Sequence, residues 1–146
     1  MAPIVATAEV ERSAADVFAY ATDPTRFAEW QAGVVSGRMD GGSARVGARC
    51  VTVRRIGGAE RPSTSELVRL EPSRAWAVRG LDGPIRAAVD VTVEPLGDAR
   101  SRVAIAVDFA GHGIGKVLVP LVVRREARKE MPANLARLKE RLESRP

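Results

Sequence analysis

Residues 85–109 read IRAAVDVTVEPLGDARSRVAIAVDF, and this stretch decides the fold. Apolar residues alternate with polar ones through residues 85–94 and 101–110, which is the period of a β-strand with one buried face. Residues 95–98, Pro-Leu-Gly-Asp, have the composition of a tight turn. The buried face is predicted to carry Ile85, Ala87, Val89, Val91, Val93, Val103, Ile105, Val107 and Phe109. The stretch therefore predicts an antiparallel hairpin with one dry side.

The preceding residues continue this pattern of short strands separated by glycine and proline. We expect strands at 3–11, 34–39, 48–56, 63–71 and 74–80. Trp76 and Val78 share one face and are predicted to point inward. In the strands at 34–39, 48–56 and 63–71 the alternation is too weak to assign a buried face.

Helical signals flank the strands on both sides. Ser13 and Asp16 approximate a capping box, and Asp23-Pro24 opens a second short helix that Gly33 ends. Residues 114–143 have helical periodicity. Their apolar residues form two stripes about a quarter turn out of phase, which we attribute to Pro120 and Pro132. The first stripe comprises Ile114, Leu118, Leu121 and Val122, and the second comprises Met131, Leu135, Leu138 and Leu142.

These elements predict an α+β fold: a curved, seven-stranded antiparallel sheet around a long C-terminal helix, with two short helices between the first two strands. The helix is the only element large enough to cover the dry side of the sheet. Because the inward positions carry mostly valine and alanine, we expect space between sheet and helix for a small apolar molecule.

Composition excludes several classes of protein. The 146 residues fit a single domain spanning 1–146, and the lone Cys50, with no leader before Glu9, predicts a cytoplasmic protein without disulfides. The net charge is +5, but basic and acidic residues are interspersed, so we expect no nucleic-acid partner. The longest apolar run, 117–123, is too short to span a membrane, so no membrane insertion is expected.

Several segments, in this order and spacing, resemble the START-related SRPBCC superfamily, and most closely its bacterial polyketide cyclase/dehydrase branch. The segments are Val10–Phe18, Asp23–Trp30, Val46-Gly47, Glu66-Leu67 leading to Glu71-Pro72, and Asn134–Glu143. The resemblance spans nearly the whole chain and implies a helix-grip fold. It also implies a pocket for an apolar ligand, without specifying a reaction.

We expect the pocket wall to combine aromatic and aliphatic side chains with one basic group. The predicted ligand-binding residues are Trp30, Trp76, Val89, Val91, Phe109, Leu118, Val122 and Arg125. Arg125 lies in line with Leu118 and Leu121 and would place a guanidinium at one end of the pocket. The candidates for catalysis are Arg125, Glu66 and the only histidine, His112.

No cofactor or metal is expected. A single histidine cannot build a histidine-based metal site. The segment Gly111–Lys116 lacks the glycine spacing of a nucleotide-binding loop.

Three hypotheses for function remain open. The first is binding of a small, largely apolar molecule resembling a polyketide, lipid or aromatic metabolite. The second is a cyclase or aromatase acting on a poly-β-ketone chain, which requires an acid or base inside the pocket. The third is an interaction or stress-associated module with a vestigial cavity. A monomer and a homodimer are both compatible with the sequence.

Overall fold

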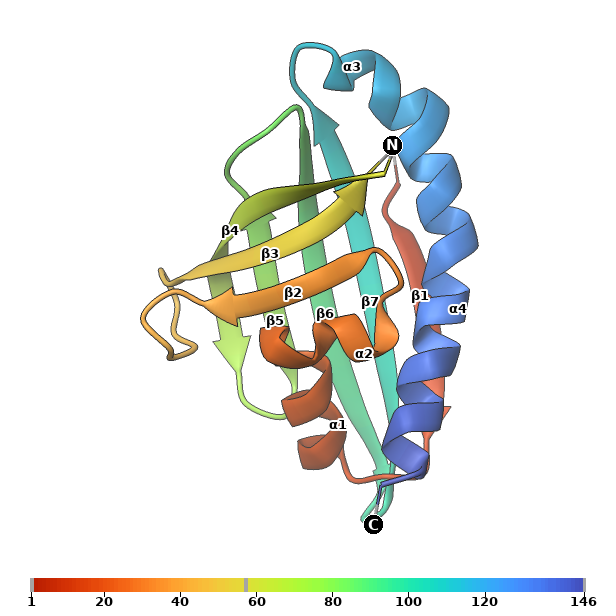
Figure 1. Cartoon of the computed structure of the whole chain (residues 1–146). Coiled ribbons are helices and arrows are strands. Elements are labelled where there is room, and N and C mark those ends of the chain that lie inside the picture. Colours follow the sequence, from red (N-terminus) through yellow and green to blue (C-terminus); the bar gives the residue numbers. More distant parts are fainter. Residues whose placement is uncertain (1, 57, 146) are drawn as a thin grey trace.

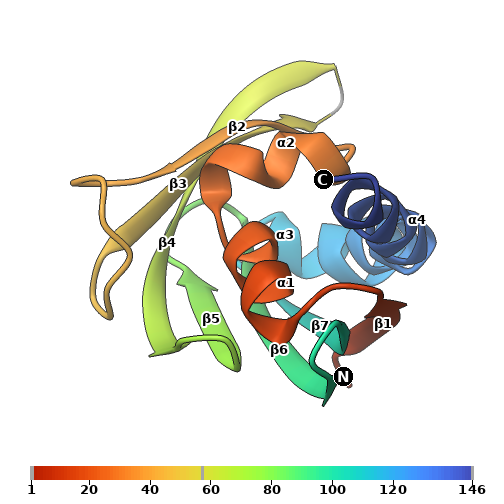
Figure 2. The same cartoon turned by 90° about the horizontal axis from the view of Figure 1, so that it is seen from below.

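The computed structural model describes residues 2–56 and 58–145 and confirms the predicted helix-grip architecture (Figure 1). One antiparallel sheet contains seven strands in the order β1-β7-β6-β5-β4-β3-β2. Their bounds are β1 Ile4–Val10, β2 Val34–Met39, β3 Arg49–Ile56, β4 Ala59–Glu71, β5 Ala75–Gly80, β6 Ile85–Gly97 and β7 Arg100–Gly111. Seen from below, the sheet curls around the interior and the C-terminal helix lies across its open side (Figure 2).

The short helices between β1 and β2 begin at the predicted caps. The Ser13 hydroxyl accepts a hydrogen bond from the Asp16 N–H (3.2 Å) at the start of α1, Ala14–Ala21. The Asp23 carboxylate accepts one from the Thr25 N–H (3.0 Å) and opens a 3₁₀ turn, η1, Pro24–Arg26. The following α2, Phe27–Trp30, directs both of its aromatic side chains into the core. The caps therefore fix where the aromatic residues enter the interior.

The inner face of the sheet matches the prediction for the decisive hairpin. Val91, Val93, Val103 and Ile105 are all at most 5% exposed. The pairing register extends this face to β3, where Cys50 and Thr52 are buried at 2% and 7% exposure. Strand β3, whose face the sequence left open, therefore turns its cysteine and threonine inward and Val51 and Val53 outward.

The C-terminal helix is α-helical at Gly115–Leu118 (α3) and Arg124–Glu143 (α4), with a π-helical segment, η2, at Val119–Val123 between them. A π-turn adds one residue to the helical repeat, so Val119 and Arg124, five residues apart, lie on the same buried face. The first apolar stripe therefore does not face the sheet: Ile114, Leu121 and Val122 are 64%, 65% and 49% exposed, and only Leu118 is half-buried. The second stripe is correct, since Met131, Leu135, Leu138 and Leu142 are buried. Helix α4 continues through Pro132 without a break.

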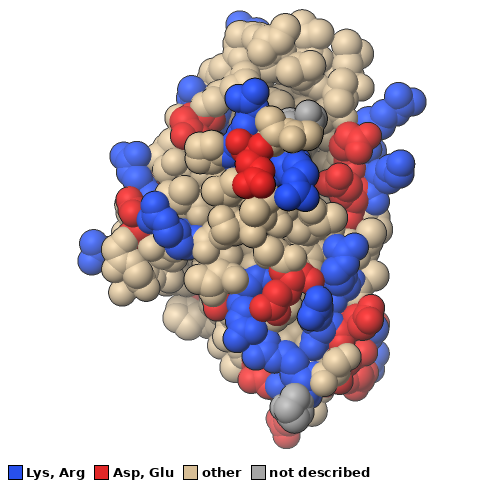
Figure 3. Space-filling view, in the orientation of Figure 1, with Lys and Arg blue, Asp and Glu red and all other residues tan. Residues whose placement is uncertain are grey.

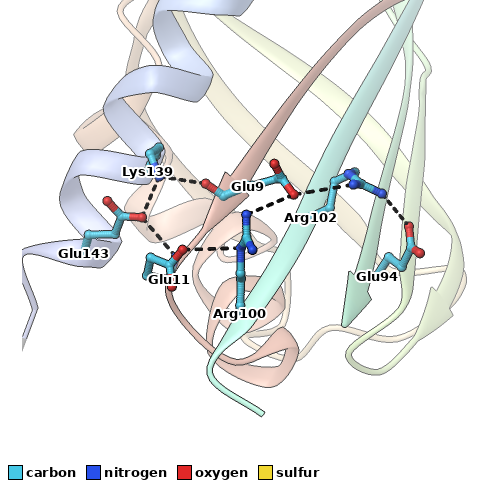
Figure 4. Close-up of polar contacts among 7 residues, drawn as sticks. All are labelled: Glu9, Glu11, Glu94, Arg100, Arg102, Lys139 and Glu143. Atoms are coloured by element: carbon cyan, nitrogen blue, oxygen red, sulfur yellow. Dashed lines mark hydrogen bonds and ion pairs between the residues drawn. The ribbon is translucent and has the colours of Figure 1, made fainter. Parts of the chain in front are cut away.

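Polar contacts fasten the end of α4 to β1 (Figure 4). The Lys139 ammonium donates to the Glu9 carbonyl (2.8 Å) and to the Glu143 carboxylate (2.7 Å). The same carboxylate accepts the Glu11 N–H (2.9 Å). Across the outer face of β1, β7 and β6, Arg100 and Arg102 pair with neighbouring glutamates. The helix is thus held at the edge of the sheet as well as by its apolar face.

Candidate functional site on the inner face

An aromatic cluster fills the lower part of the interior. Trp30 and Trp76 are 3% and 4% exposed, and the Phe27 ring stands edge-on to each, with centroid distances of 6.0 and 6.1 Å. The Nε1 atoms of both indoles are buried and have no hydrogen-bond partner among the described residues. An unpaired buried donor costs on the order of 1–3 kcal/mol, so the two indoles are held in place by the packing of the cluster and not by hydrogen bonds.

Aliphatic and aromatic side chains form the wall beside this cluster. Val91 is buried, whereas Val89, Val107 and Phe109 face inward but are only half-buried. The register pairs Val89 with both Val78 and Val107, so these side chains lie side by side across three strands. The interior is therefore closely packed around the tryptophans and remains partly accessible along β6 and β7.

Two of the three remaining predicted wall residues, Val122 and Arg125, lie outside the interior. Leu118 is half-buried on α3, Val122 is 49% exposed, and Arg125 is exposed on the outer side of α4. The cause is the π-turn, which rotates Val119 and Arg124 inward in their place. Arg124 does not supply the predicted basic end either, because its guanidinium donates to the Ala2 carbonyl (2.7 Å) and pairs with Asp108 (3.5 Å).

The other two catalytic candidates also lie outside the interior. Glu66 pairs in register with Arg49 and Arg79 on the outer face of the sheet. His112 is exposed in the turn between β7 and α3. The three nominated residues are therefore not brought together, and none of them faces the interior.

Arg54 is the inward-facing charge that the sequence did not reveal. It follows Cys50 and Thr52 on alternate positions of β3 and is half-buried. It makes no ion pair and donates no side-chain hydrogen bond to any residue the structure describes. Its direct cross-strand neighbour is Arg61 of β4, a second guanidinium. Like charges placed opposite each other are destabilising, so this pair favours an anionic or electron-rich group between them.

Burial dominates the electrostatics around Arg54. It lowers the pKa of the guanidinium, while the thiol of Cys50 and the carboxylate of Glu130 act in the opposite direction. Burial likewise raises the pKa of Cys50, against a hydrogen bond with Ser65 and the charge of Arg54. The arginine remains cationic at neutral pH, because guanidinium pKa values lie far above it.

Cys50, Thr52 and Arg54 form a polar strip on the inner face of β3, and hydroxyl groups extend this strip onto β4. Thr52 faces Ser63 across the two strands, and Cys50 faces Ser65, whose hydroxyl donates to the Cys50 carbonyl (3.5 Å). The only sequence signal for the strip was the alternation Cys50, Thr52, Arg54. Val51 and Val53 obscured it, because on hydrophobicity they are the better candidates for an inward face.

Packing requires two of the three glycines in the segment Gly111–Lys116, and the third, Gly113, has a positive φ of 60°. A Cβ atom on Gly115 would collide with the Pro84 carbonyl, and one on Gly111 would collide with the backbone of Gly115. The His112 N–H donates to the same Pro84 carbonyl (2.8 Å), which joins this turn to the β5–β6 connection. Helix α3, at four residues, is too short to present an anion-binding N-terminus.

Two pockets of about 230 and 290 Å³ lie at the lower end of the molecule, outside the sheet. Both are lined by Tyr20, Arg26 and Arg145, and neither includes a residue of the inner face. Neither pocket therefore corresponds to the cavity that the sequence predicts between sheet and helix. Within residues 2–56 and 58–145 no group of three or more metal-ligating side chains is found. No helix in that part of the chain is long and apolar enough to cross a membrane.

The chain matches the model of a known protein family. The family model for "Polyketide cyclase / dehydrase and lipid transport" matches residues 1–143. No curated protein sequence matches significantly.

Solved structures share the fold. Zhui aromatase/cyclase from Streptomyces sp. R1128 is 15% identical with a TM-score of 0.79, over 97% of this chain and 93% of that one. A START superfamily protein from Mycobacterium smegmatis is 15% identical with a TM-score of 0.71, over 98% of both chains. The di-domain aromatase/cyclase BexL of the BE-7585A biosynthetic pathway is 17% identical with a TM-score of 0.76. The match covers 98% of this chain but only 47% of BexL.

Proposed function

Because the chain belongs to the polyketide cyclase / dehydrase and lipid transport family, we propose that it binds a small, largely apolar molecule on the inner face of its sheet. Residues 1–146 act as one ligand-binding domain. The ligand resembles a polyketide, lipid or aromatic metabolite and carries an acidic or enolisable group.

The observation that carries this proposal is Arg54, a half-buried guanidinium without an ion-pair partner among the described residues. A protein gains nothing in stability by holding such a charge opposite Arg61. A carboxylate, phenolate or enolate oxygen would accept charge-assisted hydrogen bonds from it. The half-buried Val89, Val107 and Phe109 supply the surface for the apolar body of the ligand.

Cyclisation of a poly-β-ketone is a second candidate, and the same guanidinium favours it. An arginine aimed at a developing enolate lowers the barrier to enolisation. The reaction also needs a base, yet no aspartate, glutamate or histidine occupies an inward position on the described strands. Binding is therefore the function that the site supports best.

Two fluorescent naphthalene probes test the proposal. Anilinonaphthalene sulfonate is apolar and anionic, and N-phenyl-1-naphthylamine has nearly the same shape without the charge. We expect Arg54→Gln to weaken sulfonate binding about tenfold, the range of a charged hydrogen bond, and to change binding of the neutral probe less than about twofold. Thermal stability should be unchanged or higher, because an unpaired charge is removed.

Arg55→Gln is the matched control. Arg55 is the next residue on the same strand but faces outward, where it pairs with Glu60 (3.7 Å). Its substitution should leave both probes unaffected. Equal binding of the sulfonate by wild type and Arg54→Gln would refute the assignment of Arg54. Native mass spectrometry of the purified protein would reveal a co-purified ligand.

A further inference from the structure

Four large aliphatic side chains lie exposed on one short segment at the upper end of the molecule. Ile114, Val117, Leu121 and Val122 are 64%, 53%, 65% and 49% exposed. They are half of the large apolar residues that the structure shows exposed. We call these four residues the upper patch. In Figure 3 the upper end, where Figure 1 places α3, is free of charged side chains over a broad area.

The upper patch is exposed because of the helix geometry. The π-turn directs Val119 and Arg124 toward the sheet, and the side chains at 117, 121 and 122 consequently point away from it. Each exposed aliphatic side chain forgoes roughly 1.5–3 kcal/mol of burial free energy. Clustered apolar exposure of this kind marks a surface that contacts something other than water.

Basic side chains lie within the upper patch and on the helix turns that follow it. Lys116 lies within the segment, and Arg125, Arg128 and Lys129 follow on the first turns of α4; all four are exposed. Glu126 is the only acidic residue between Ile114 and Lys129. Arg125 and Arg128 are exposed on the turns of α4 that directly follow the upper patch, so this part of the helix exposes apolar side chains at its upper end and basic side chains below.

We propose that the upper patch docks this protein onto an anionic lipid surface. The aliphatic side chains enter the boundary between headgroups and acyl chains, and the basic residues meet the lipid phosphates. A second copy of the chain is the less suitable occupant, because a two-fold contact would bring the basic residues of both copies together.

Vesicle co-sedimentation tests the apolar part of the surface. We expect the wild-type chain to bind vesicles of phosphatidylcholine mixed with phosphatidylglycerol, and to bind pure phosphatidylcholine at least about tenfold more weakly. The double variant Ile114→Gln with Leu121→Gln should lose at least about tenfold of the binding to anionic vesicles. Val46→Gln is the matched control, since Val46 is 60% exposed in the β2–β3 loop, far from α3 (Figure 1), and should bind like wild type.

Two single substitutions test the basic residues beside the upper patch separately from its apolar residues. Lys116→Gln and Arg125→Gln should each weaken binding about fivefold, and added salt should weaken it further. Absence of wild-type binding, or undiminished binding by the double glutamine variant, overturns the proposal. A wild-type dimer that the double variant converts to a monomer would reassign the upper patch to self-association. Binding of the naphthalene sulfonate through Arg54, measured without vesicles, should be the same in the double variant, so failure of docking and failure of ligand binding are distinguishable.

Discussion

Tyr20 shows how one buried hydroxyl is held in its neutral form. Its side chain is 4% exposed, its hydroxyl donates to the Glu29 carboxylate (2.9 Å), and the Arg145 guanidinium stacks 5.1 Å above the ring. Burial, and then the bond to Glu29, raise the pKa of Tyr20 to about 12, against the charges of Arg141 and Arg145. Burial opposes ionisation of Glu29 too, but hydrogen bonds from Tyr20 and Arg26 leave its pKa below the ordinary value.

A pH titration of tyrosinate absorbance measures the pKa of Tyr20 directly, because Tyr20 is the only tyrosine in the chain. The midpoint should lie near 12 in the folded protein and near 10 when the chain is unfolded. A folded pKa above the unfolded one means that this stabilisation is fully present below pH 10 and is lost as the pH rises toward 12. Tyr20→Phe should remove that loss, whereas a folded midpoint near 10 would contradict the assigned contacts.

At the scale of elements, α4 depends on both its apolar stripe and its polar contact with β1. The Glu143 carboxylate joins Lys139 to the Glu11 backbone, and the hydrogen bond from Lys139, followed by that from Glu11, lowers the pKa of Glu143. The exposed ladder of Arg100 and Arg102 on the neighbouring strands contributes less, because solvent screens such pairs. Glu143 is therefore one of the polar residues that fix the helix end, together with Lys139.

Glu143→Gln should lower the free energy of unfolding by about 0.5–1.5 kcal/mol at neutral pH, measured by urea denaturation. The pKa of Glu143 is lower in the folded protein than its ordinary value of 4.5, so the stabilisation by its carboxylate is fully present above pH 4.5. The difference in unfolding free energy between wild type and Glu143→Gln should therefore shrink as the pH falls below 4.5. Glu140→Gln, an exposed change on the same helix, is the control and should be neutral. A difference that persists undiminished in acid would argue against the carboxylate contacts as its source.

At the scale of the whole molecule, the reactivity of the Cys50 thiol measures access to the interior. Cys50 is the only thiol, is 2% exposed, and lies on the inner face of β3 beside the Arg54 strip. Burial raises the pKa of Cys50, so both shielding and a low thiolate fraction protect it.

Labelling of Cys50 by a thiol reagent should therefore be at least about 10³-fold slower in the folded protein than in urea, in keeping with the small unfolded fraction of a stable domain. Bound naphthalene sulfonate should slow it further, because the ligand occupies the same face. Cys50→Ser, which has no thiol, gives the background. Rapid labelling of the folded protein would show that the β2–β4 half of the sheet opens readily.

The sequence by itself determined the elements and their order, because strand and helix periods, caps and turn residues are local properties. It also determined the inner face of residues 85–109, where apolar and polar residues alternate cleanly, and with it Trp76, Val89, Val91 and Phe109 as interior residues. Trp30 was identified by its size and its place after the Asp23 cap.

Only the tertiary structure decided which way β3 and the first part of the C-terminal helix face. In β3 both faces mix apolar and polar residues, so pairing with β2 and β4, not hydrophobicity, turned Arg54 inward. In the helix, a single extra residue in the π-turn changed the direction of every side chain before Arg124 relative to those after it. Val122 and Arg125 consequently do not face the interior, and the basic residue that does face it is Arg54 on β3.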